Sequence, residues 1–218
     1  MVTEFTDRFP FVGPLVWIAS IQYFHFQLLT AQAWPVPYDW ATNLISDLGN
    51  TACGDYDGRY VCSLDHATMN VSFIALGITM AIGSVLIYTM FEKTRGSRVG
   101  FTMMGLSGIG TILVGAFPEN VAPLMHGIGA FLALVIGNVS LLVLAASLQK
   151  VRRAFRYYTA ISGMVSLVAF VLFELNVTFG LGRGGMERLV SYPLTLWLML
   201  FGLYMMQVRV RAAMRRKA

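Results

Sequence analysis

Six long apolar stretches divide this 218-residue chain, and only short polar segments separate them. Hydrophobic residues make up 56% of the chain and charged residues 12%, which is too apolar for a soluble domain of this size. A hydrocarbon core about 30 Å thick needs roughly 20 apolar residues per helix. The sequence therefore predicts an all-α polytopic membrane protein, with residues 1–218 forming a single six-helix transmembrane domain. The expected crossings are 11–32, 66–91, 98–117, 121–148, 156–179 and 188–208.

Basic residues are sorted onto one side of these crossings. Thirteen Lys and Arg fall on the side that holds both termini and three on the other, whereas the acids divide three against eight. Lys and Arg resist translocation, so the sorting predicts cytoplasmic N and C termini in a multi-pass protein of the cell membrane. The basic residues on the predicted cytoplasmic side are Arg8, Lys93, Arg95, Arg98, Lys150, Arg152, Arg153, Arg156, Arg209, Arg211, Arg215, Arg216 and Lys217, and the acids there are Glu4, Asp7 and Glu92.

The net charge of +5 does not indicate a nucleic-acid partner, because the basic residues flank the predicted helices. Anchoring to anionic membrane lipids explains this placement better, although such clusters are also compatible with a membrane-protein partner. The first apolar segment differs from a cleavable signal peptide. It is long, contains Pro14, Gln22 and His25, and lacks a small-residue cleavage site.

The two cysteines of the chain, Cys53 and Cys62, both lie in the first predicted outer loop, residues 33–65. A pair of cysteines outside the cytoplasm favours a disulfide, which would staple this long loop. A zinc pair is the rival interpretation, but the loop offers no local His partner beside these thiolates.

Polar residues within the apolar segments gather towards the outer side. Between the cytoplasmic loops and the outer third of the membrane the predicted helices carry no ionisable side chain, and Gln22 and Asn138 are the main polar exceptions. Coupled transporters generally need polar groups near the midplane with a path to both sides. The one-sided pattern therefore disfavours a transporter.

The spacing of the outer polar residues suggests shared faces. Asn43, Ser46 and Asp47 stand at i, i+3 and i+4, so a helix over 40–48 would align them, although Ser46 or Asp47 could instead cap a turn. His66 and Asn70 are also four residues apart at the start of a predicted helix.

Two carboxylates stand out near the ends of the later predicted helices. Glu119 and Asn120 follow Pro118 in a short turn, and His126 comes soon after them. Glu174 is expected about one helical turn before its helix ends at the outer side. An ionisable group at membrane depth is costly and indicates a functional role.

Several of these elements together resemble a known family. They are Tyr38-Asp39-Trp40, Ile45-Ser46-Asp47-Leu48-Gly49, the loop between Cys53 and Cys62, His66 with Asn70, Phe117-Pro118-Glu119-Asn120, His126, and Gly184-Gly185-Met186-Glu187-Arg188 with Tyr192-Pro193. The chain resembles the bacterial six-helix membrane family catalogued as domain of unknown function 998, over nearly its whole length. The resemblance implies the six-helix fold and singles out these outer positions, but it implies no reaction.

Two functions remain open from the residues. The first is an enzyme, a lipid hydrolase or transferase that processes a lipid or lipid-linked substrate at the outer leaflet through histidine and carboxylate acid–base chemistry. The second is a non-catalytic protein that binds a ligand or a membrane-protein partner, in which the same groups form a buried polar network. For the enzyme, the candidate catalytic residues are Asp47, Glu119, Glu174, His66 and His126, and the candidate binding residues are Asn43, Ser46, Asn70, Asn120, Arg188 and Tyr192.

A metal among His25, His66 and His126 is a weaker variant of the enzyme, because the chain lacks a helical His-x-x-x-His signature. We therefore predict no metal site, and the sequence identifies no cofactor.

Overall fold

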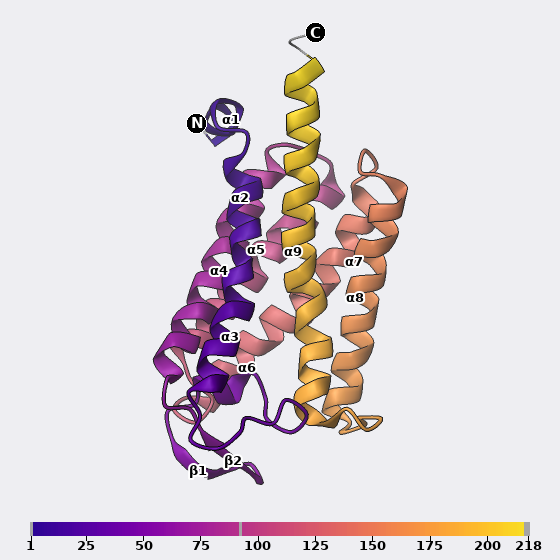
Figure 1. Ribbon diagram of the computed structural model, residues 1–218. Coiled ribbons are helices and arrows are strands. Elements are labelled where there is room, and N and C mark those ends of the chain that lie inside the picture. The colour runs from indigo at the N-terminus through magenta and orange to yellow at the C-terminus, as the bar shows by residue number, and fades with distance from the viewer. Residues whose placement is uncertain (1, 92, 216–218) are drawn as a thin grey trace.

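The computed structural model describes residues 2–91 and 93–215 and shows a bundle of long helices with a loop and a hairpin at one end (Figure 1). Among the described residues, five helical segments are long and apolar enough to cross a membrane. They are α4 (His66–Tyr88), α5 (Arg95–Ala116), the combined segment Pro123–Ser147, α8 (Arg153–Glu174), and residues Gly182–Arg211 of α9 (Gly182–Arg215).

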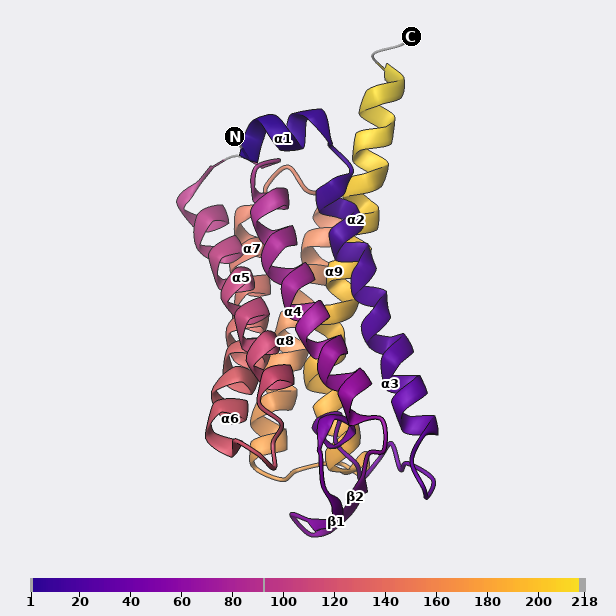
Figure 2. The same cartoon turned by 90° about the vertical axis from the view of Figure 1, so that its left-hand side faces the viewer.

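The first apolar segment is helical but is not one helix. It consists of α2 (Val12–Ile18), a 3-10 turn η1 (Ala19–Ile21) and α3 (Gln22–Gln32), which run along α4 and α9 (Figures 1 and 2). Gln22 gives a hydrogen bond of 3.1 Å to the Ser72 carbonyl and accepts one of 2.9 Å from the Ser72 hydroxyl, so both ends of its amide are paired.

A π-helical turn interrupts the fourth apolar segment. α6 (Pro123–Phe131) begins with proline, whose missing N–H costs nothing in a first turn. It continues through η3 (Leu132–Ile136) into α7 (Gly137–Ser147). Two carbonyls of the π turn accept side-chain donors, at 2.9 Å from Ser107 to Ala133 and at 2.6 Å from Asn138 to Leu134. Such turns are frequent at functional sites because they displace the helix wall.

Small residues bring α5 against its neighbours. A Cβ atom on Gly108 would lie 2.6 Å from the Gly77 carbonyl oxygen of α4, and one on Gly110 would lie 2.6 Å from the Gly129 carbonyl oxygen of α6. Only glycine permits these approaches, which bring the three helices together at the outer half of the bundle.

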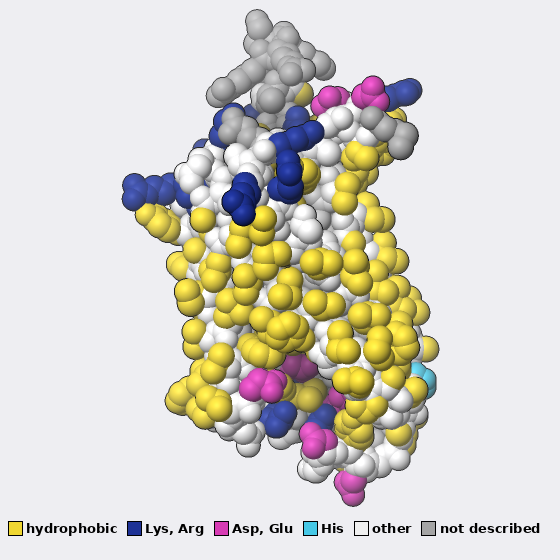
Figure 3. Space-filling view, turned by 180° about the vertical axis from the view of Figure 1, so that it is seen from behind, with side chains coloured by type: hydrophobic (Ala, Val, Ile, Leu, Met, Phe, Trp, Pro, Cys, Tyr) yellow, Lys and Arg dark blue, Asp and Glu magenta, His cyan; other side chains and the backbone are white. Residues whose placement is uncertain are grey.

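Charge and apolar surface divide the molecule into bands. On the face shown in Figure 3, apolar side chains form a broad band across the middle, and Lys and Arg gather at the end of the bundle where α1 (Val2–Arg8) and the end of α9 also lie (Figures 2 and 3). Glu92, Arg216 and Lys217, which contribute to the charge sorting in the sequence, lie outside the described residues.

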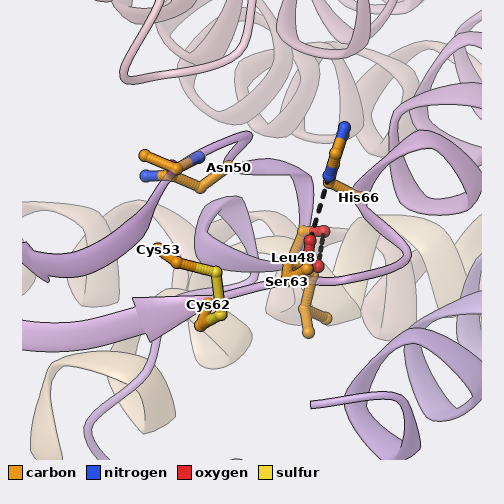
Figure 4. Close-up of a disulfide and its surroundings, with 7 residues drawn as sticks. Leu48, Asn50, Cys53, Cys62, Ser63 and His66 are labelled. Carbon is orange, nitrogen blue, oxygen red and sulfur yellow. Dashed lines mark hydrogen bonds between the residues drawn. A yellow bond between two sulfur atoms is a disulfide. The ribbon is translucent and has the colours of Figure 1, made fainter. Parts of the chain in front are cut away.

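The predicted outer loop is ordered by a hairpin and a disulfide. Strand β1 (Cys53–Tyr56) pairs antiparallel with β2 (Arg59–Cys62), and Asp57 and Gly58 form the turn with φ of 49° and 76°. An Asp-Gly turn of this kind matches the twist of a hairpin. The predicted disulfide is confirmed, because Cys53 and Cys62 are opposite partners in the hairpin and are bonded (Figure 4).

Three helix predictions are wrong in extent. The expected crossing 188–208 is the central part of a longer helix, α9, which starts at Gly182 and ends at Arg215. The expected helix over 40–48 is reduced to a short 3-10 turn, η2 (Ser46–Gly49). The helix expected over 156–179 instead runs from Arg153 to Glu174. Beyond its end, Asn176 and Phe179 adopt positive φ. No helical turn follows Glu174, because these left-handed residues turn the chain back towards α9.

Candidate functional site

The end of the bundle that carries the hairpin contains a buried ion pair between Asp47 and Arg59. Asp47 lies in η2 with its residue fully buried, and Arg59 of β2 donates from Nε at 2.8 Å and from Nη2 at 2.6 Å. The Leu44 backbone N–H adds a third hydrogen bond of 2.7 Å to the carboxylate. A bidentate contact from a guanidinium group offsets the desolvation free energy of a buried carboxylate. Asp47 therefore holds the loop to the hairpin in this structure.

Glu119 lies next to this pair, in the connection between α5 and α6. Its Oε1 accepts a hydrogen bond of 2.9 Å from Asn50 and lies 3.9 Å from Nη2 of Arg59. Burial, followed by the negative charge of Asp47, raises the pKa of Glu119 to about 8, although Asn50 and Arg59 oppose the shift. Glu119 is accordingly held as a carboxylic acid near neutral pH.

His126, Ser46 and Glu187 form a continuous chain of contacts. Nδ1 of His126 donates to the Phe117 carbonyl at 2.9 Å, and Nε2 lies 3.1 Å from the Ser46 hydroxyl. The same hydroxyl lies 3.2 Å from Oε1 of Glu187, whose Oε2 accepts the Ile45 backbone N–H. A histidine and a carboxylate that lie on different helices are thus joined through one serine.

The guanidinium of Arg188 is largely occupied by the loop. Its Nη1 donates to the carbonyls of Trp40, Asn43 and Gly184 at 2.8 to 3.0 Å, and its Nη2 donates to the Tyr38 hydroxyl. The guanidinium carbon also lies 5.4 Å from the Tyr38 ring centre and 4.8 Å from that of Trp40. In this arrangement Arg188 fixes the loop over the start of α9.

A cavity of about 70 Å³ extends from these polar groups into the bundle. Ser46, Glu187 and Ser191 contribute polar atoms to its wall, and the π-helical Leu134 and Ala133 lie on another side. The remaining wall is mainly apolar, formed by Tyr23, Ile45, Phe73, Leu76, Met80, Thr111, Val114, Ala130, Leu194 and Thr195. Figure 3 shows a hollow at this end of the molecule, with acidic and basic side chains visible between apolar walls.

The remaining candidate histidines and Glu174 do not join this group. His66 starts α4, and its Nδ1 donates to the Ser63 carbonyl at 3.0 Å beside the disulfide (Figure 4). His25 is exposed on α3, and Glu174 is exposed at the last residue of α8. Within residues 2–91 and 93–215, no group of three or more His, Cys, Asp or Glu side chains is placed to hold a metal ion.

The candidate binding amides and Tyr192 form internal hydrogen bonds. Asn43 donates to the Tyr60 carbonyl at 3.0 Å, Asn70 to the Gly49 carbonyl at 2.9 Å, and Asn120 to the Thr51 hydroxyl at 2.9 Å. Tyr192 donates to Oε1 of Gln27 at 2.8 Å. These contacts tie the loop and α3 to the bundle.

Sequence reasoning missed Arg59 as a member of the polar cluster at the hairpin end of the bundle. No role was assigned to Arg59 from the sequence, yet its side chain is only 11% exposed and faces two carboxylates. The Asp57-Gly58 pair could have indicated the hairpin, and the alternation along its second strand would then have turned Arg59 towards the bundle.

The apolar helices, the band of apolar surface and the polar cluster at one end define an integral, multi-pass membrane protein. The family model described as Protein of unknown function (DUF998) matches residues 12–204, so the chain belongs to this family. No curated protein and no solved structure matches the chain.

Proposed function

We propose that the protein crosses the cell membrane six times, with both termini in the cytoplasm. The rod formed by α2, η1 and α3 would make the sixth crossing beside the five longer segments. The gathering of Lys and Arg at the end with α1 and the end of α9 supports this orientation.

Single-cysteine labelling in intact cells tests this topology. The only two cysteines are bonded to one another, so an added cysteine is the sole reactive thiol. A membrane-impermeant maleimide should label Phe179→Cys, which replaces a side chain that is 79% exposed between α8 and α9. It should label Gln149→Cys, in the exposed α7–α8 connection, only after the cells are opened. The reverse pattern would overturn the orientation.

We further propose that the outer end binds and processes a lipid or a lipid-linked substrate. One observation carries this proposal: the cavity is apolar towards the bundle and polar at Ser46 and Glu187, next to His126. An amphiphilic substrate could place its polar group at these side chains and apolar atoms along the cavity. His126 is the proposed acid–base group, while Asp47, Glu119 and Arg188 support the loop that carries Ser46.

The binding part of the proposal can be tested by identifying lipid that remains with the gently purified protein. Ala130→Leu would enlarge a half-buried side chain on the cavity wall and should reduce the amount of retained lipid. Ala146→Leu makes the same change at an exposed position of α7 and should retain as much lipid as the natural chain. Equal retention by both folded variants would contradict a lipid site in the cavity.

A non-catalytic role is the second candidate, and one observation favours it. The charged groups of Asp47, Arg59 and Arg188 are engaged in contacts within the chain, as expected of a polar network that orders a loop. In this case the outer loop and hairpin would present a rigid surface to a membrane-protein partner. Retention of lipid without any turnover would favour this candidate.

A further inference from the structure

We propose that Ser46 is the nucleophile of an acyl-transfer reaction on a carboxylic ester of a membrane lipid, with His126 as its general base. The inference rests on the proposed lipid site and assigns its substrate class and reacting atom. Three observations carry it: the contacts of the two His126 nitrogens, the two contacts of the Ser46 hydroxyl, and the side chains that line the cavity.

The Phe117 carbonyl determines which nitrogen of His126 is the base. A carbonyl oxygen can only accept, so Nδ1, at 2.9 Å, must carry a proton and donate it. In the neutral ring Nε2 then has its lone pair free, and this atom lies 3.1 Å from the Ser46 hydroxyl oxygen. Serine, base and an orienting acceptor are the three parts of an activated nucleophile, here with a backbone carbonyl as the third part.

Counting protons defines the role of Glu187. The Ser46 hydroxyl has one proton, but its oxygen lies 3.1 Å from Nε2 of His126 and 3.2 Å from Oε1 of Glu187. If neither neighbour carried a further proton, one of these contacts would join two acceptors. An imidazolium at His126 would also satisfy both contacts, but it could not act as a base, so the proposed reaction requires the proton on Glu187, which then donates to Ser46 while Ser46 donates to His126. Glu187 is thus a positioning residue that directs the serine proton towards its base.

The charge around the cavity favours a neutral ester over a phosphoester as the bond that is attacked. Arg59 faces Asp47 and Glu119, and Arg188 faces backbone carbonyls, so no Lys or Arg of the described chain lines the cavity itself. A carboxylic ester adds no charge, and its acyl chain matches the apolar wall.

The reaction balances with water as the second reactant. Ser46 Oγ attacks the acyl carbon while its proton passes to Nε2 of His126, and the departing lipid alcohol takes that proton as the ester bond breaks. Water then attacks the acyl-serine and gives its proton to His126. Oγ leaves with that proton, which releases the fatty acid. Transfer to a second lipid alcohol follows the same course with that alcohol in place of water.

A fluorophosphonate probe on the full-length purified protein tests the nucleophile. The probe forms a Ser46 Oγ–phosphorus bond and expels fluoride, and peptide mass spectrometry locates the adduct. We expect labelling at Ser46, its loss in Ser46→Ala, and a labelling rate lowered by about 10²-fold or more in His126→Gln. Ser147→Ala is the control, since Ser147 is a half-buried serine of α7 outside the residues that line this cavity, and it should label like the natural chain.

The outcomes separate this inference from the lipid site on which it rests. Thermal unfolding of each variant identifies those that remain folded, and retained lipid is measured on the same samples. A folded natural chain that retains lipid but is not labelled at Ser46 overturns the nucleophile alone. Labelling that is unchanged in a folded His126→Gln overturns the proposed base. The ester chemistry is supported if Ser46 is labelled and fatty acid is released from phosphatidylglycerol vesicles, with both signals absent in Ser46→Ala. Labelling of Ser46 without fatty-acid release overturns the proposed lipid-ester substrate.

Discussion

Arg59 forms a bidentate ion pair with Asp47, in which Nε lies 2.8 Å from Oδ2 and Nη2 lies 2.6 Å from Oδ1 of the carboxylate. This pair joins the hairpin to the 3-10 turn that carries Ser46. The Asp47 side chain is fully buried, and the Arg59 side chain is 11% exposed. The position of Ser46 in the cavity wall therefore depends on a contact outside the helical bundle.

Removing this arginine should destabilise the outer loop strongly. Arg59→Ala leaves the Asp47 carboxylate buried without its cation, and breaking such a pair typically costs about 3–5 kcal/mol. Asp57→Asn is the matched control. It weakens a 3.1 Å contact of the same arginine to a carboxylate that is 68% exposed, which is worth at most about 1 kcal/mol. Unfolding in detergent measures both, and similar losses would contradict a dominant role for Asp47.

The disulfide should stabilise the hairpin measurably. It closes a loop with a sequence separation of 9, for which the chain-entropy relation gives about 2–3 kcal/mol. We expect the double variant Cys53→Ser, Cys62→Ser to melt at a lower temperature than the natural chain. Reductant should lower the melting temperature of the natural chain but not that of the variant. A reductant effect on the variant would show that the loss has another cause.

Stability should fall as pH rises towards the pKa of Glu119. Its pKa of about 8 in the folded chain exceeds the ordinary value of 4.5, so the folded state holds a proton that the unfolded chain releases. The stabilisation is complete below the ordinary value and is lost as pH rises through about 8. The melting temperature should therefore decline between about pH 5 and pH 8.

Glu119→Gln provides the control for this pH dependence. The amide cannot ionise, and its oxygen can still accept the hydrogen bond from Asn50. We expect a flatter profile of melting temperature against pH. A decline as steep as that of the natural chain would assign the effect to another group.

Glu187→Gln should preserve the contact chain, whereas Glu187→Ala should break it. A glutamine can donate to Ser46 through its amide and accept the Ile45 N–H through its oxygen, as a protonated glutamate does. Alanine leaves the Ile45 N–H unpaired, which costs about 1–3 kcal/mol. Unfolding measurements distinguish the two variants. A glutamine variant as unstable as the alanine variant would indicate that Glu187 must be ionised.

Two glycines of α5 provide a matched test of the helix packing. Gly108→Ala would place a Cβ 2.6 Å from the Gly77 carbonyl oxygen, whereas at Gly105 the same atom meets nothing within 4 Å. The first change should force α4 and α5 apart at a cost of about 1–3 kcal/mol. The second should be neutral or stabilising by up to about 1 kcal/mol. The fraction of each variant that remains folded after heating in detergent measures the difference.

The extent to which the fold could be predicted differs between the bundle and the loop. Apolar length alone predicts that α4, α5, α8 and α9 exist, and it predicts the bounds of α4 and α5 to within a few residues, because a crossing segment must satisfy its own backbone hydrogen bonds. The interruptions at η1 and η3 carry no comparable signal. They depend on neighbours such as Ser107, whose hydroxyl binds a carbonyl that the π turn leaves available. The end of α8 at Glu174 likewise depends on left-handed residues that apolar periodicity does not reveal.

The candidate site shows the same limit. The sequence placed Ser46, Asp47, Glu119, His126 and Arg188 on one side of the membrane, but it could not say which of them meet. Ser46 and His126 are 80 residues apart, and Ser46 and Glu187 are 141 apart. Their contacts require α6, α9 and the outer loop to be packed together.

The sequence by itself determined that this chain belongs in a membrane, that its charges are sorted, and that its two cysteines pair. These properties follow from the free energy of transferring each segment from water to lipid and from the spacing of residues close together in the chain. Only the tertiary structure decided that Arg59 faces Asp47 and that Ser46 lies between His126 and Glu187 above an apolar cavity. Such contacts depend on how separate helices and loops pack, and residue spacing within one element does not encode that packing.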